Sequence, residues 1–298
     1  MRRLLVALLA GITLAACGSA SPVSPSGTAP VPNAPSEVPA ERTPARVLII
    51  SIDGLRPDAV WQSGAPNLMA LATSGAYSWR ALTISPSTTL PSHVSMLTGF
   101  TPSVHGIVWD EYEPARGPLP VPTIFADARA RGLRTALVAG KAKFATFRDP
   151  TVWAVVPGGD AAVADRAVSE ALTRPDLLFV HLPDVDLTGH STEWMSPAYF
   201  AAVARADEAV GRIVAASGPG VTVIVSADHG GHSANHTEGT PVDSTIPWII
   251  SGPGIARGRY LSTQISTVDT AATAAHVLGI SLGPGASGKP VLEAFSGR

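Results

Sequence analysis

Short runs of continuously apolar residues alternate along this chain with longer segments of helical periodicity. The runs predict buried strands at residues 47–52, 77–84, 134–138, 177–182, 221–225 and 246–250. The periodic segments predict helices at residues 66–74, 93–97, 121–131, 160–172, 197–216 and 267–278. No internal repeat interrupts the alternation. It therefore predicts an α/β fold, with a doubly wound, mostly parallel central sheet flanked by helices, in one domain covering residues 46–298.

Acidic and imidazole side chains follow three of the predicted strands. Asp53 comes directly after the first strand, Asp228 and His229 come after the fifth, and Asp186 and His190 come soon after the fourth. Ligands of open α/β sheets bind outside the carboxyl ends of the strands, so these residues predict a metal site at one sheet edge. Considered alone, Asp53 could cap a turn, and Asp186 with His190 could be a surface pair. The prediction of a metal site therefore depends on all of these residues occurring together.

A hydroxyl-rich loop precedes the predicted helix at residues 93–97. Its sequence over residues 85–92 is Ser-Pro-Ser-Thr-Thr-Leu-Pro-Ser. A hydroxyl at the start of a helix faces unpaired N–H groups and the positive end of the helix dipole. This is a favourable position for a nucleophile that attacks an anionic phosphorus centre.

The N-terminal residues indicate export. A basic pair at residues 2–3 precedes an apolar stretch that is too short to span a bilayer, as in a signal peptide. The stretch ends in Leu-Ala-Ala-Cys, which resembles the bacterial lipobox, whose cysteine (here Cys17) becomes the lipidated first residue of the mature protein. We expect residues 1–17 to be a lipoprotein signal peptide and the protein to be anchored in the cell envelope, on its periplasmic or extracellular face. The alternative is an ordinary secretory signal cleaved nearby.

Residues 18–45 consist mainly of Ser, Pro, Ala and Gly, with few bulky apolar side chains. Such a segment cannot bury enough surface to offset its ordering entropy, so it is predicted to be a disordered tether. The whole chain has a net charge of −2, so binding of duplex nucleic acid is not expected. With a single cysteine, an intramolecular disulfide is excluded. The oligomeric state is not predicted.

Four motifs together resemble the alkaline phosphatase superfamily, most closely its nucleotide pyrophosphatase/phosphodiesterase branch. They are Ser-Ile-Asp-Gly-Leu-Arg-Pro-Asp at residues 51–58, Thr-Thr-Leu-Pro-Ser-His at 88–93 with His-Gly-Ile at 105–107, Asp-Leu-Thr-Gly-His at 186–190, and Asp-His-Gly-Gly at 228–231. They occur in the order found in the family. The resemblance implies an alkaline phosphatase-like fold and a two-metal phosphoester hydrolase, which the N-terminal residues indicate is exported.

The resemblance also implies a role for each matching residue. It implies two sets of metal ligands: Asp186, His190 and His236 for one ion, and Asp53, Asp228, His229 and the Thr89 oxygen for the other. His232 is a nearby alternative to His236, which is preferred for its position. Mixed carboxylate and imidazole ligands suit zinc, so two zinc ions are expected. Thr89 is the implied nucleophile, which would form a phospho-threonine that water then hydrolyses.

Two departures from the family pattern concern the substrate. Asp110 stands where the family usually has an asparagine that holds a phosphate oxygen, and an ionised carboxylate would repel the phosphoryl group. Lys141 and Lys143 match a lysine pair of monoester- and phosphonate-cleaving relatives, and would offset Asp110; alternatively, they are solvated loop lysines. These three residues are the candidate contacts to a small phosphoester. A phosphodiesterase/nucleotide pyrophosphatase is favoured, with a phosphomonoesterase or phosphonate hydrolase as the alternative.

Other function classes are open at this point. A phosphoryl transferase would use the same nucleophile and an alcohol acceptor instead of water. A non-catalytic binding lipoprotein would keep the fold alone. A formylglycine sulfatase is not expected, because no Cys/Ser-x-Pro-x-Arg pattern occurs in the chain.

Overall fold

The computed structural model describes residues 45–297. The predicted signal peptide with Cys17, and the predicted tether up to residue 44, lie outside the described residues. Among the helices within residues 45–297, none combines the length and the hydrophobicity that a membrane span requires.

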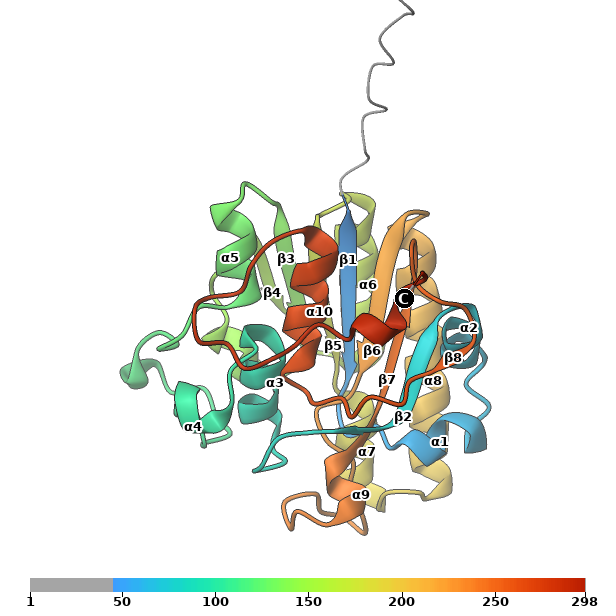
Figure 1. Cartoon of the computed structure of the whole chain (residues 1–298). Coiled ribbons are helices and arrows are strands. Elements are labelled where there is room, and N and C mark those ends of the chain that lie inside the picture. Colours follow the sequence, from blue (N-terminus) through green and yellow to red (C-terminus); the bar gives the residue numbers. More distant parts are fainter. Residues whose placement is uncertain (1–44, 298) are drawn as a thin grey trace, which may run out of the picture. The chain divides into compact units, whose positions relative to one another are not determined.

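An eight-stranded sheet forms the centre of the fold (Figure 1). Its strand order is β4-β3-β5-β1-β6-β7-β2-β8. The five strands from β4 to β6 are parallel, β7 is antiparallel to both β6 and β2, and β8 is parallel to β2. The strands are β1 Arg46–Ile52, β2 Ala76–Leu82, β3 Thr135–Ala139, β4 Val152–Val155, β5 Leu177–Leu182, β6 Val221–Ser226, β7 Thr245–Ser251 and β8 Arg259–Tyr260.

Helices cover both faces of the sheet. Helices α3, α5 and α10 lie on the face nearest the viewer in Figure 1, and α6 and α8 lie behind the sheet. The helices are α1 Pro57–Gln62, α2 Pro66–Ser74, α3 Thr89–Thr98, α4 Pro102–His105, α5 Ile124–Ala130, α6 Gly159–Leu172, α7 Asp184–Thr192, α8 Pro197–Ser217, α9 Pro241–Ser244 and α10 Asp269–Leu278, with 3₁₀ turns η1 Pro114–Arg116, η2 Ala142–Thr146 and η3 Leu292–Ala294. The predicted doubly wound α/β fold class is confirmed.

The structure corrects the start of one predicted helix and adds a helix that was not predicted. Helix α3 begins at Thr89 and not at residue 93, because Pro91 lies in the first turn, where a missing N–H breaks no helical hydrogen bond. Asp186 and His190 lie on helix α7 and not in a loop. This helix has too few apolar residues to show a helical period. Its two ligand candidates are spaced i, i+4, which places them on one helix face.

The three central strands bring the candidate site residues to one edge of the sheet. Strand β1 lies between β5 and β6, with Ser51 in register with His181 on one side and with Ser226 on the other. All three strands are buried almost throughout. Because they are parallel, the residues that follow them emerge together. Gly54 turns the chain out of β1 with φ +70°, and a Cβ there would lie 3.0 Å from the Cα of Asp186, so only glycine fits.

The first turns of α6 and α7 are joined by two acidic side chains. The Asp184 N–H donates to the Asp160 carboxylate and the Asp160 N–H donates to the Asp184 carboxylate, each at 3.0 Å. Asp160 is 3% exposed, and its Oδ2 has no hydrogen-bond partner among the described residues. Burial, followed by the charge of Asp184, raises the pKa of Asp160 to about 7.

Asp160→Asn is therefore expected to change how stability depends on pH. The folded protein holds the Asp160 proton more tightly than the unfolded chain. The stability due to this proton is thus fully present below the ordinary carboxyl pKa and is lost as pH rises through about 7. We expect the melting temperature of the variant, minus that of the wild type, to increase by about 5 °C between pH 5 and pH 8.5. Asp165→Asn, on the exposed face of the same helix, is the control. A difference in melting temperature between Asp160→Asn and the wild type that is the same at pH 5 and pH 8.5 would contradict the prediction.

Candidate active site

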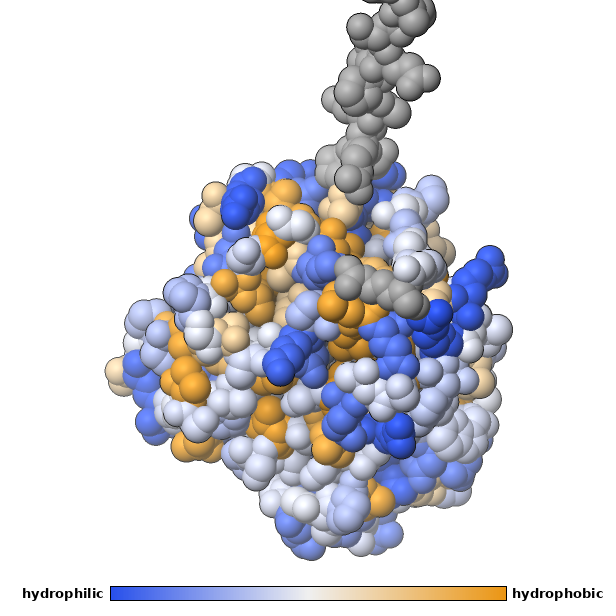
Figure 2. All heavy atoms as spheres, viewed as in Figure 1, coloured by the Kyte–Doolittle hydropathy of each residue, from blue (hydrophilic) through white to orange (hydrophobic). Residues whose placement is uncertain are grey.

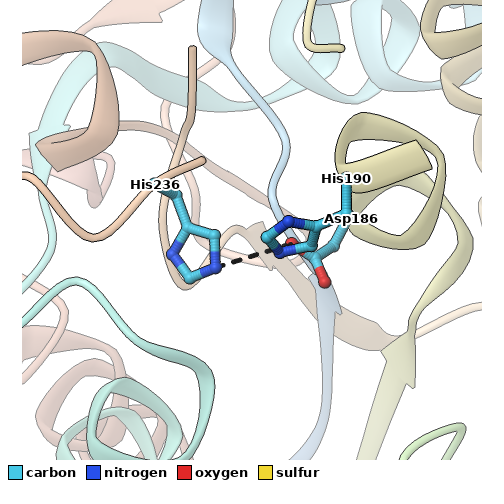
Figure 3. A group of neighbouring side chains, drawn as sticks. All are labelled: Asp186, His190 and His236. Atoms are coloured by element: carbon cyan, nitrogen blue, oxygen red, sulfur yellow. Dashed lines mark ion pairs between the residues drawn. The ribbon is translucent and has the colours of Figure 1, made fainter. Parts of the chain in front are cut away.

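The first group of ligand candidates joins α7 to the loop after β6 (Figure 3). The Asp186 and His190 side chains come from α7, and the His236 side chain faces them from the loop. The Nε2 atoms of His190 and His236 lie 3.4 and 3.9 Å from Asp186 Oδ1. One ligand atom from each side chain lies within 4.8 Å of the others, which is compatible with one metal ion.

The second group surrounds His229. Its Nε2 lies 3.3 Å from Asp53 Oδ1, 3.4 Å from Asp228 Oδ2 and 3.9 Å from Asp186 Oδ1. The side chains of Asp53, Asp228 and His229 have no exposed surface. Asp186 therefore lies between the two groups. The six carboxylate and imidazole ligand candidates implied by the resemblance meet at one place.

Backbone carbonyls fix the ring orientation of the three histidines. The Nδ1 atoms of His190, His229 and His236 lie 3.0, 2.9 and 2.7 Å from the carbonyl oxygens of Ala234, Gly230 and Ser87. A carbonyl oxygen only accepts, so each Nδ1 carries the proton and donates. The lone pair of each neutral ring is then at Nε2, the atom that faces the carboxylates. Metal-binding histidines characteristically have this arrangement.

Buried ligand atoms without partners gather at the same place. Among the described residues, Asp53 Oδ1, Asp186 Oδ1, Asp228 Oδ2 and His229 Nε2 are buried and make no hydrogen bond. A buried polar atom without a partner costs free energy, and several such atoms facing one another are expected where an ion is bound. The donor set of carboxylates and imidazoles suits zinc. These residues therefore fit the binding of divalent metal.

The charges of the cluster also indicate that a cation binds there. Burial, followed by the charge of Asp53, raises the pKa of Asp228 to about 8. Burial would lower the pKa of His229, but Asp228 and Asp53 outweigh it and raise that pKa to about 10. Without added positive charge, the three carboxylates of the cluster cannot all be ionised in a buried site. With this raised pKa, the His229 ring carries a second proton on Nε2 when no metal is bound, and a metal ion at Nε2 would take the place of that proton.

Thr89 is connected to this cluster through His93. Thr89 is 2% exposed and is the first residue of α3. Burial lowers the pKa of His93 well below its usual value, so the ring is neutral. Its Nδ1 donates to the Thr89 carbonyl at 2.7 Å and lies 3.5 Å from Asp228 Oδ2, while its Nε2 accepts from Ser51 at 2.8 Å. One buried ring thus links the predicted nucleophile to a predicted ligand.

The three predicted substrate contacts are all engaged with other side chains. Lys141 Nζ lies 2.7 Å from Asp53 Oδ2 and 2.6 Å from Asp186 Oδ2, bridging the two ligand groups. Lys143 Nζ lies 2.7 Å from Asp110 Oδ2. Both lysine side chains are largely buried. Solvated loop lysines, the alternative interpretation, are therefore contradicted for both.

Two buried histidines were not among the predicted site residues. His181 accepts the Gly140 N–H at Nδ1, so its Nε2 carries the proton and donates to Asp53 Oδ2 at 2.8 Å. His93 makes the contacts described above. Neither ring has a free lone pair for a metal. A histidine inside the apolar run of β5 is the sequence signal for His181, since a buried imidazole requires polar partners.

His232 lies apart from the ligand groups. Its Nδ1 lies 2.7 Å from Asp243 Oδ1 and its Nε2 lies 3.3 Å from Glu238 Oε2. The structure thus brings His236, and not His232, to Asp186.

A cavity of about 270 Å³ is lined by residues of the segment that follows α4 and by Leu90 of α3. Its walls include Leu90, the residue after Thr89, together with Ile107, Trp109 and Arg116. The Arg116 guanidinium stacks on the Trp109 ring at 4.0 Å. The ring face of Trp109 is therefore occupied by this chain's own arginine.

Curated relatives were found over parts of the chain. An uncharacterised pyrophosphatase/phosphodiesterase of Schizosaccharomyces pombe is 25% identical over 227 residues, which are 62% of this chain and 44% of that protein. A phosphopentomutase of Methylobacterium radiotolerans is 33% identical over 132 residues, covering 43% of this chain and 31% of that protein. The chain thus spans less than half the length of these curated relatives.

Solved structures share the fold. Human ectonucleotide pyrophosphatase/phosphodiesterase 5 superposes with a TM-score of 0.70 at 14% identity, covering 84% of this chain and 100% of that chain. A 2-O glycosaminoglycan sulfatase superposes with a TM-score of 0.69 at 15% identity, covering 83% of this chain and 73% of that chain. A phosphonate monoester hydrolase of Silicibacter pomeroyi superposes with a TM-score of 0.66 at 17% identity, covering 85% of this chain and 77% of that chain. The fold is therefore alkaline phosphatase-like.

The type I phosphodiesterase/nucleotide pyrophosphatase family matches this sequence over residues 47–167 and 147–249. These matches run from β1 through α3, α7 and the loop after β6, so they include every ligand candidate and Thr89. On this evidence, the chain belongs to the type I phosphodiesterase/nucleotide pyrophosphatase family.

Proposed function

We propose that this protein hydrolyses small phosphodiesters, with Thr89 as the nucleophile and two divalent metal ions, zinc being the expected metal, as cofactors. One observation carries the proposal. Buried, unpartnered ligand atoms of Asp53, Asp186, Asp228 and His229 meet at one sheet edge, and His93 joins this cluster to the helix that begins with Thr89.

The chain's own groups prepare Thr89 for attack on phosphorus. Thr89 stands at the N-terminus of α3, where the positive end of the helix dipole would favour a negatively charged phosphoryl group. His93 holds the Thr89 carbonyl and thereby the nucleophile's backbone. Bound divalent ions would lower the pKa of the Thr89 hydroxyl and neutralise charge on the phosphoryl group. Attack of the Thr89 oxygen would break one P–O ester bond and release that group as an alcohol, leaving a phospho-threonine; water would then hydrolyse its P–O bond, release the remaining phosphate ester and regenerate the threonine.

The lysine contacts favour a diester over a monoester. A monoester carries a second negative charge that a diester lacks, and an unpaired lysine near Thr89 would attract that charge in addition to the metal ions. Lys141 is paired with Asp53 and Asp186, and Lys143 is paired with Asp110. The cavity beside Leu90 offers room for an organic ester group. Phosphomonoester or phosphonate hydrolysis stays the alternative.

The relatives support this proposal by analogy. The inactive threonine-to-alanine variant of murine ectonucleotide pyrophosphatase/phosphodiesterase 5 was solved in complex with AMP, at a TM-score of 0.67 and 14% identity. We extend to this chain the inference that a threonine is required for turnover and that phosphoesters of this size are bound. Export and lipid anchoring through Cys17 remain part of the proposal and depend on the N-terminal sequence alone.

Thr89→Ala is expected to abolish turnover while leaving metal content unchanged. Without the hydroxyl no phospho-threonine can form, so kcat on bis-p-nitrophenyl phosphate should fall by about 10³-fold or more. The ligand side chains are untouched, so the protein should bind the same number of zinc ions, measured by elemental analysis after gel filtration. Thr89→Ser, which keeps a hydroxyl, should retain part of the activity. Unimpaired turnover by Thr89→Ala would exclude Thr89 as the nucleophile.

His236→Gln and His232→Gln should separate a ligand from a nearby non-ligand. His236 Nε2 faces Asp186, whereas His232 is paired with Asp243 and Glu238. We expect His236→Gln to weaken binding of one zinc ion by about 100-fold or more in competition with a chelator, and to lower kcat/KM. His232→Gln should bind zinc as the wild type does. Equal zinc affinity in both variants would remove His236 from the ligand set.

A further inference from the structure

The ion pair between Asp110 and Lys143 lies next to the nucleophile. Lys143 Nζ is 2.7 Å from Asp110 Oδ2, and the other carboxylate oxygen of Asp110 accepts the N–H of Leu90 at 2.7 Å. Leu90 directly follows Thr89, so Asp110 is hydrogen-bonded to the peptide unit that joins the two residues. The Lys143 side chain is 10% exposed, while that of Asp110 is 37% exposed.

The pair contributes almost no net charge at this position. Lys143 has one further acidic neighbour, Glu111, at 3.9 Å, but that carboxylate is 81% exposed and therefore strongly screened. The other lysine, Lys141, is held by Asp53 and Asp186 at 2.7 and 2.6 Å. A diester brings one negative charge to Thr89, and a monoester brings up to two. A neutral pair offers the monoester no additional attraction.

We propose that the Asp110–Lys143 pair is the specificity determinant that keeps this enzyme selective for singly charged phosphodiesters. Asp110 holds the Lys143 ammonium and cancels its charge, so the cation is not available to the second negative charge of a monoester. The inference rests on the proposed hydrolysis at Thr89 and goes beyond it. It assigns the choice between the two substrate classes to one pair of side chains.

Asp110 has a second, separable task. Its Oδ1 holds the Leu90 N–H and so positions the peptide that follows the nucleophile. Asp110→Asn keeps an oxygen acceptor for this N–H, and removes the negative charge and the acceptor that faces Lys143. Asp110→Ala removes the acceptor for the Leu90 N–H as well. Comparing the two variants distinguishes the electrostatic effect from the positioning effect.

The test uses the zinc-loaded protein and two substrates with the same leaving group, p-nitrophenyl phosphate and bis-p-nitrophenyl phosphate. The quantity measured is the kcat/KM for the monoester divided by the kcat/KM for the diester. Asp110→Asn leaves a positive charge at the pair, so the ratio should increase by about tenfold. Lys143→Met leaves a negative charge, so the ratio should decrease by about tenfold.

The double variant Asp110→Asn/Lys143→Met is the matched control. It is neutral like the wild type, so its ratio should return to within about threefold of the wild-type value, even if both absolute rates fall. The increase for Asp110→Asn should also shrink between low salt and about 1 M NaCl, since screening weakens charge effects. A shift due to altered packing alone would not reverse in the double variant.

Several outcomes would overturn the inference. An Asp110→Asn ratio equal to that of the wild type would show that the pair does not set charge selectivity. A fall in both rates for Asp110→Asn, with the ratio unchanged, would leave Asp110 with the positioning task only. Either result would leave the proposed function intact, because that proposal fails separately, if Thr89→Ala keeps full activity. Melting temperatures of all variants would identify any that do not fold.

Discussion

The burial of Asp53, Asp186 and Asp228 at one sheet edge is the constraint on which the site depends. Three carboxylates that are out of reach of water cannot remain ionised unless cations face them. The chain supplies one cation permanently, the ammonium of Lys141, which contacts the Oδ2 atoms of Asp53 and Asp186. The opposite oxygens of these two carboxylates face the histidines. The cluster therefore has a lysine side and a histidine side, and only the histidine side has free ligand atoms.

The order of the central strands makes this arrangement possible. Strand β1 lies between β5 and β6, although these three strands are far apart in the sequence. Parallel pairing aligns their carboxyl ends, and the residues that follow each strand meet without any long loop. Helix α3 then adds Thr89 and His93 from a different part of the chain. The same three strands thus form the buried centre of the sheet and bring the metal-ligand candidates together at its edge.

Much of this arrangement could be predicted from the sequence, because buried parallel strands are continuous apolar runs. Those runs gave the positions of β1, β5 and β6 and the residues directly after them. Helix α7 was missed because Asp, Thr and Gly outnumber apolar residues in it, so no helical period is visible. The contacts of Lys141 and Lys143 could not be predicted either. They depend on where the long side chains turn, and the sequence pattern carries no information about that.

The three main-chain carbonyls that orient His190, His229 and His236 have a consequence for the evolution of the site. Every residue type has a carbonyl oxygen, so the anchors at Ala234, Gly230 and Ser87 do not depend on which side chain stands there. Substitutions that preserve the loop path leave the ring orientations unchanged. The side chains of these three anchor residues can therefore vary, wherever a new side chain fits, without changing how the imidazole rings are held.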